Sequence, residues 1–188
     1  MNIFLPYEDN INKSVEVLDD KRLIKQILEC YQLLQLVEKE KQNGDVLKGA
    51  GYHNHPIYKH YKQYENFLFL YGYTCCCEYE YRFDNHHRYF EYFEHEINSC
   101  KRAENYNYIP FYMEGSKGQP NYIRTTENVS QLYQRKLVHK WLNTYGGCTW
   151  TNRKKPEFLM EVVRNGERMI KRASEDKDYF YEIIWEVD

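Results

Sequence analysis

The sequence contains no run of about 18 apolar residues, so we expect no membrane-spanning helix. Its first residues, MNIFLPYEDN, lack a basic segment followed by a long apolar stretch, and we therefore expect no secretion signal. The net charge is also close to zero, because 26 Lys and Arg residues nearly balance 28 Asp and Glu residues. Any contact with nucleic acid must then come from a local basic patch rather than from overall charge. We expect a cytoplasmic protein with no membrane partner.

Spacings typical of disulfide frameworks and zinc sites are also missing. Cys75, Cys76 and Cys77 are consecutive and so poorly placed to pair with one another, and no CxxC spacing occurs. We expect reduced thiols and no zinc. The triplet at residues 53–55 spells HNH, but a metal-dependent nuclease needs further ligands, and three adjacent side chains point in different directions. The sequence favours a protein without a metal or cofactor.

Tyrosine, by contrast, is abundant, with 20 residues in a chain that is 17% aromatic. Because Tyr combines a large apolar face with a polar tip, it suits a partly buried surface, including one that stacks on bases. A composition rich in Asn, Lys and Tyr is equally expected from an AT-rich genome. Both interpretations stay open at this point.

Helical spacing dominates the chain. Apolar residues recur at threes and fours through residues 14–41, which predicts a first long helix. Further helices are expected at 57–82, at 86–97, at 127–143 and from Pro156 to about residue 173. Pro and Gly residues indicate an extended loop at 105–126. We predict an all-α fold, a single compact helical domain over residues 1–188 with long surface loops.

The first predicted helix carries a polar stripe close to the chain start. Arg22, Lys25, Glu29 and Gln32 are separated by three, four and three residues, so on a helix they share one face. An amphipathic helix needs a polar face, and Lys25 with Glu29 is an ordinary pair on neighbouring turns. By spacing alone the stripe is a solvent-facing surface, so a functional role needs another indication.

Short motifs spread over the chain supply that indication. They are MNIF at the start, DKRLIKQILECYQLL at 20–34, NHP at 54–56, EYEYRF at 78–83, PF at 110–111 and WTNRKKPEF at 150–158. Together they resemble the pyrimidine-dimer DNA glycosylase (endonuclease V-like) family, and more closely a group of phage proteins similar to it. The resemblance implies that DNA is the partner.

The resemblance also implies a pair of catalytic groups. In this family the α-amino group at the chain start attacks the sugar carbon, and one carboxylate of the first long helix assists, which implies Met1 and Glu29 here. An α-amine suits this role because its pKa is about 7.7–8.0, so part of it is neutral and nucleophilic at cellular pH. The two arginines that flank the carboxylate in the family fall on Leu28 and Gln32, which leaves specificity for dimers open.

Basic residues in or beside the motifs are the candidates for DNA contact. Lys21, Arg22 and Lys25 are placed to hold the phosphates that flank the target. The further candidates are His55, Arg82, Arg153 and Lys154. Aromatic candidates to support an unstacked base are Tyr52, Tyr58 and Trp150.

We therefore hypothesise a DNA glycosylase, with or without abasic-site lyase activity, that excises damaged or modified pyrimidines. Two alternatives stay open, because one scaffold can host several chemistries. The first is the same scaffold used in DNA base hypermodification or nucleotide chemistry. The second is a non-catalytic phage counter-defence protein that keeps only the shape. The sequence does not indicate an oligomeric state.

Overall fold

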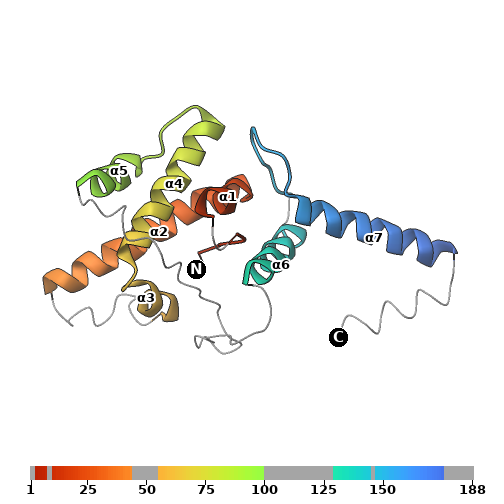
Figure 1. Cartoon of the computed structure of the whole chain (residues 1–188), viewed down its shortest axis with the longest axis horizontal. Helices are drawn as coiled ribbons and strands as arrows, with labels where there is room; N and C mark the ends of the chain where they lie inside the picture. The colour runs from red at the N-terminus through yellow and green to blue at the C-terminus, as the bar shows by residue number, and fades with distance from the viewer. Residues whose placement is uncertain (1–2, 8–9, 44–54, 100–128, 145–146, 176–188) are drawn as a thin grey trace. The chain divides into compact units, whose positions relative to one another are not determined.

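The structure is a computed structural model that describes residues 3–7, 10–43, 55–99, 129–144 and 147–175. By their contacts the residues group into two compact units, Met1–Arg153 and Lys154–Asp188, and each is described by itself. Every regular element within the described ranges is a helix (Figure 1). The predicted all-α fold class is thereby confirmed, whereas the single domain over residues 1–188 stays a prediction.

The described part of the first unit holds six helices. They are α1 (Ile11–Glu16), α2 (Asp20–Asn43), α3 (Pro56–Tyr61), α4 (Glu65–Phe83), α5 (Phe90–Ser99) and α6 (Val129–Leu142). Residues 3–7, before the first of them, are not helical. The second unit holds α7 (Glu157–Glu175).

Two of the predicted long helices are each divided in two. The predicted helix over 14–41 is α1, which ends at Glu16, followed by α2, which begins at Asp20. The predicted helix over 57–82 is α3 followed by α4, and His55 caps the start of α3. Helix α4 ends at Phe83, because the following residue, Asp84, adopts the left-handed conformation with a φ of 50°.

The core of the first unit contains α2 packed against α4. The buried stripe of α2 follows helical spacing and consists of Leu23, Ile27, Cys30, Leu34 and Val37. Each large apolar side chain buried in this way stabilises the fold by about 1.5–3 kcal/mol. Ile24, another apolar residue of α2, lies outside this stripe and is 41% exposed. Where α4 meets α5, a Cβ atom on Gly72 would lie 2.3 Å from the Phe93 ring, so the close approach requires glycine.

The segment 3–7 is held by three helices of the first unit. The Phe4 amide donates to Gln26 of α2 at 2.9 Å, and the Phe4 carbonyl accepts from the Tyr71 hydroxyl of α4 at 2.7 Å. The Phe4 ring packs edge-on against Tyr133 of α6, with ring centroids 6.3 Å apart. Because residues 3–5 are also buried, this segment is part of the core.

The second unit is described through α7, in which Arg164 pairs with Glu157. The helix predicted from Pro156 to about residue 173 agrees with its bounds. None of the described helices is both long and apolar enough to cross a membrane. The predicted loop at 105–126 lies outside the described residues.

Candidate functional site

Gln26 joins the described beginning of the chain to the first long helix. It lies among the buried residues of α2 and is 1% exposed. Its Oε1 accepts hydrogen bonds from the Phe4 amide at 2.9 Å and from the Tyr71 hydroxyl at 3.3 Å. A buried amide needs such partners, because an unsatisfied polar group in the core costs about 1–3 kcal/mol. The Gln26 side chain therefore determines where residue 4 lies relative to α2.

The other end of the same amide contacts Glu29. The Nε2 of Gln26 donates to Oε2 of Glu29 at 3.1 Å, and the ammonium of Lys25 lies 3.7 Å from Oε1. Glu29 is 4% exposed. A carboxylate that has lost its hydration is stable only where donors and cations replace the water. Two neighbours on its own helix thus position Glu29, and one side chain separates it from residue 4.

Two groups beside the contact chain, which runs from Phe4 through Gln26 to Glu29, stay protonated at neutral pH. Burial raises the pKa of the Tyr71 phenol well above its usual value, so its hydroxyl remains a donor to the Phe4 carbonyl. Burial also raises the pKa of the Cys30 thiol, and a protonated thiol is a poor nucleophile. In the part of the chain that the structure describes, no group of three His, Cys, Asp or Glu residues could hold a metal ion.

The outer surface of α2 beside Glu29 is basic. The Lys25 side chain is 65% exposed, and Lys21, one turn earlier, is exposed as well. Exposed ammonium groups at this spacing can attract the phosphates of a nucleic acid. The buried carboxylate therefore has a positively charged edge, and this edge comes from local sequence rather than from the overall charge of −2.

Arg22 belongs to the same stripe but is used inside the protein. Its guanidinium donates to Oδ2 of Asp19 at 3.1 Å and to the Thr144 hydroxyl at 2.7 Å, and 16% of the side chain is exposed. Asp19, fully buried, also accepts from the Trp141 indole at 2.7 Å. Asp19 and Arg22 therefore hold the C-terminal end of α6 against the start of α2. A phosphate contact by Arg22 stays a prediction.

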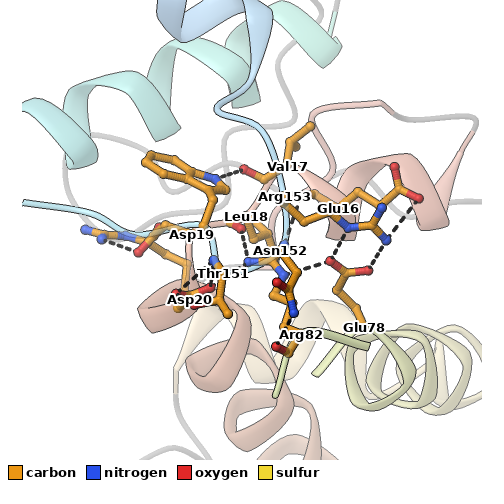
Figure 2. A network of polar contacts seen from close by, with 12 residues as sticks. Glu16, Val17, Leu18, Asp19, Asp20, Glu78, Arg82, Thr151, Asn152 and Arg153 are labelled. Carbon is orange, nitrogen blue, oxygen red and sulfur yellow. Dashed lines mark hydrogen bonds and ion pairs between the residues drawn. The ribbon is translucent and has the colours of Figure 1, made fainter. Parts of the chain in front are cut away.

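Asp20 lies at the centre of a second polar network (Figure 2). Its carboxylate accepts from Nη1 of Arg82 at 3.0 Å and from the Thr151 hydroxyl at 2.9 Å. Burial alone would raise the pKa of the Asp20 carboxyl, but hydrogen bonds from Thr149, Arg82 and Thr151 outweigh burial and lower the pKa below its usual value. Asp20 is therefore ionised at neutral pH and holds residues 149–151 against α2.

Arg82 completes this network from α4 and is 1% exposed. Its guanidinium donates to the Leu18 carbonyl at 2.8 Å, to the Glu16 carbonyl at 2.9 Å and to Glu78 at 2.7 Å. In Figure 2 these acceptors surround the arginine. A guanidinium buried among internal acceptors stabilises the fold, and a phosphate contact by Arg82 stays a prediction.

Arg153 forms a two-point ion pair with Glu78, at 2.9 Å and 2.7 Å. This pairing is the main reason that the pKa of Arg153 is raised. The guanidinium also lies over the Tyr81 ring, 4.1 Å from its centroid. Because 26% of the side chain is exposed, a DNA contact by Arg153 stays a prediction.

The family model of pyrimidine dimer DNA glycosylases matches residues 1–91. This confirms the predicted resemblance to the family. The matched residues include the segment 3–7, helices α1 to α4 and the contact between Gln26 and Glu29, whereas α6 and α7 lie beyond the match. Comparisons with curated proteins and with solved structures found no match.

Pyrimidine dimer DNA glycosylases act on DNA, so the match implies DNA as the substrate. Lys21 and Lys25 are exposed on that edge. His55 is the N-cap of α3, where its Nδ1 accepts from a backbone amide at 3.2 Å. Lys154 is exposed and belongs to the second unit. DNA contacts by these four residues stay predictions, and Met1 lies outside the described residues.

The aromatic residues considered for a glycosylase's unstacked base have structural contacts instead. Tyr58 is 1% exposed, and its hydroxyl donates to Glu40. Trp150 is 9% exposed, and its indole donates to the Val17 carbonyl at 3.0 Å. Both side chains therefore stabilise the fold, while Tyr52 lies outside the described residues.

Two residues of the site were missed by sequence reasoning. Gln26 carried a signal, because it is polar at a position where the spacing of Leu23, Ile27 and Cys30 requires a buried residue. Tyr71 carried none, because it is one of 20 tyrosines and no local pattern distinguishes it. Its role depends on the contact with Phe4, which is distant in sequence.

Proposed function

We propose that the protein is a DNA glycosylase that excises damaged or modified pyrimidines through the α-amino group of Met1 and the carboxylate of Glu29. The contact chain from the Phe4 amide through Gln26 to Glu29, with hydrogen bonds of 2.9 Å and 3.1 Å, carries this proposal. It holds the described beginning of the chain one side chain away from a buried carboxylate. An amine and a carboxylate are the two groups that glycosylase chemistry of this family requires.

In the first step the neutral amine attacks C1′ of the target deoxyribose. The bond between C1′ and the base nitrogen breaks, and the base leaves with the bonding electrons and takes up a proton. The sugar ring opens, and C1′ remains bound to the amine nitrogen as an imine. A target nucleotide must leave the helical stack for this attack, because C1′ is otherwise covered.

Glu29 acts twice in this scheme. Its negative charge first stabilises the positive charge that develops on the sugar. It then takes a proton from C2′ of the imine, after which the C3′–O bond breaks and the phosphate leaves, so that the strand is cleaved by elimination. Gln26 and Lys25 keep the carboxylate in one position for both steps. Leu28 and Gln32 stand where the family has arginines, and we therefore propose a pyrimidine substrate that is not restricted to dimers.

The proposal is tested by borohydride reduction of the protein with duplex DNA that contains an abasic site. We expect a covalent complex that disappears when the α-amino group is acetylated, because acetylation removes the nucleophile. We also expect Glu29→Gln to lower base release from ultraviolet-treated or hydroxymethyl-pyrimidine DNA by roughly 10²–10⁴-fold. Trapping that survives acetylation would rule out the amine.

Glu38→Gln is the matched control. Glu38 lies on the same helix and accepts from Gln35, three residues before it, at 2.9 Å, as Glu29 accepts from Gln26. Because no contact joins Glu38 to residues 3–7, the described beginning of the chain, its variant is expected to release base at the wild-type rate. Equal rates for Glu29→Gln and Glu38→Gln would exclude Glu29 from the chemistry.

A further inference from the structure

Helix α6 lies beside the segment 3–7 in the first unit. The Tyr133 ring contacts the Phe4 ring with centroids 6.3 Å apart, and the Gln134 amide donates to the Pro6 carbonyl at 3.0 Å. Two turns further along, the ammonium of Lys140 lies 5.9 Å from the centroid of the Phe4 ring. The helix therefore places a lysine over the residue whose amide Gln26 binds.

Lys140 and Lys25 approach the same contact chain from its two ends. Lys25 is 3.7 Å from the Glu29 carboxylate, whereas Lys140 is next to Phe4 at the other end. The backbone of Lys140 is also tied to α2, because its carbonyl accepts from Arg22 at 3.4 Å. Both lysine side chains are exposed. The site is thus bordered by an ammonium group from α2 and by another from α6.

The charge of Lys140 is not neutralised by an ion pair in the described part of the protein. Lys41 and Lys62 differ from it, because Glu65 lies 2.6 Å from the first and Glu40 lies 3.0 Å from the second. An ammonium that rests on an aromatic ring keeps its charge and remains accessible to an anion. In a chain with a net charge of −2, such a group is a local attractor for phosphate.

We infer that Lys140 binds a DNA phosphate beside the site, so that α6 contributes a DNA contact in addition to those of the lysines of α2. The inference rests on the proposed glycosylase function. Charge complementarity favours it, since the exposed ammonium of Lys140 lies beside Phe4 and the phosphates of DNA are negatively charged. Because α6 lies beyond the residues matched by the family model, Lys140 extends the DNA contact beyond residues 1–91.

The test is the salt dependence of binding to a duplex that carries a tetrahydrofuran abasic-site analogue. Each phosphate contact contributes about 0.9 to the slope of log affinity against log salt. We therefore expect Lys140→Ala to reduce this slope by about 0.9. Between about 50 and about 200 mM salt, the loss of affinity should then be about 3.5-fold smaller than for the wild type. Lys140→Arg keeps the charge and is expected to keep the wild-type slope.

Lys39→Ala is the control. Lys39 is also an exposed lysine, but it lies ten residues after Glu29 on α2, about 15 Å along the helix axis, and should leave the slope unchanged. A wild-type slope for Lys140→Ala would overturn the inference while leaving the glycosylase proposal intact. A slope for Lys140→Arg as low as that for Lys140→Ala, with unchanged melting temperatures, would also overturn it. A wild-type protein that neither binds nor cleaves any of the DNA substrates would overturn the proposed function itself.

Discussion

Replacement of Gln26 by leucine tests the contact that the proposed site depends on. Leucine has a similar length but can neither accept from the Phe4 amide nor donate to Glu29. The variant therefore leaves a buried backbone donor without its acceptor and removes the hydrogen bond from Gln26 that helps to hold the carboxylate. The hydrogen bond from Tyr71 to the Phe4 carbonyl, 2.7 Å long, is kept.

The expected loss of stability follows from these two groups. A buried donor without a partner costs about 1–3 kcal/mol, and a carboxylate that loses a hydrogen bond adds about as much. We therefore expect Gln26→Leu to lower the free energy of unfolding by roughly 2–6 kcal/mol. For a chain of 188 residues, this corresponds to a fall in Tm of roughly 4–24 °C. Misplacement of reacting groups by about 1 Å costs about 10²-fold in rate, so base release should fall by about that factor even where the variant is folded.

The assay combines thermal unfolding with single-turnover base release measured below the Tm of every variant. Gln35→Leu is the control, because Gln35 also donates to a glutamate three residues later on α2, at 2.9 Å, but at a half-buried position. It should change stability by no more than about 0.5 kcal/mol and leave the rate unchanged. Equal losses for the two variants, or a wild-type rate for Gln26→Leu, would refute the positioning role of Gln26.

Two further predictions concern the fold. Gly72→Ala is expected to destabilise the protein in urea unfolding, because the new Cβ atom would lie 2.3 Å from the Phe93 ring. Gly166→Ala is the control: a Cβ atom at this position has no atom within 4 Å, so the substitution should stabilise the protein by up to about 1 kcal/mol. Equal effects of the two substitutions would contradict the packing argument. The pKa of Asp20 is lower in the folded protein than its unfolded value of about 3.9, so its stabilising contribution is present above that pH and is lost as the pH falls through the folded-state pKa. Asp20→Asn should therefore weaken the dependence of the urea midpoint on pH in the acid range, while the exposed Asp84→Asn should not; an unchanged pH profile for Asp20→Asn would disprove the role of Asp20.

The helix boundaries show which part of the fold could be predicted. Periodic apolar residues predicted helical structure over 14–41, but not the interruption between Glu16 and Asp20. That interruption is stabilised from far along the chain, since the Asp20 amide donates to the Thr149 carbonyl at 2.9 Å and Asp19 accepts from Trp141. Helical periodicity is a property of neighbouring residues, and it contains no information about partners more than 100 positions away.

The polar stripe of α2 was predicted only in part. Lys25 and Glu29 do lie together, at 3.7 Å, but Arg22 on the same face is turned toward α6. Spacing places side chains on one face of a helix and does not say which of them other elements cover. The same limit explains Arg82, whose motif suggested a surface contact and whose four acceptors belong to residues of α1, α2, α4 and the α1–α2 connection.

The sequence by itself determined the helical class and the resemblance to the family, because apolar periodicity and short motifs are local features that need no partner to be recognised. Only the tertiary structure decided which polar residues are buried and what they hold. Gln26 became the link between residue 4 and Glu29 because Phe4 and Tyr71 fold onto it from 22 and 45 positions away. A buried amide needs hydrogen-bond partners. The partners of Gln26 outside its own helix are the residues that the packing of the protein brings next to it.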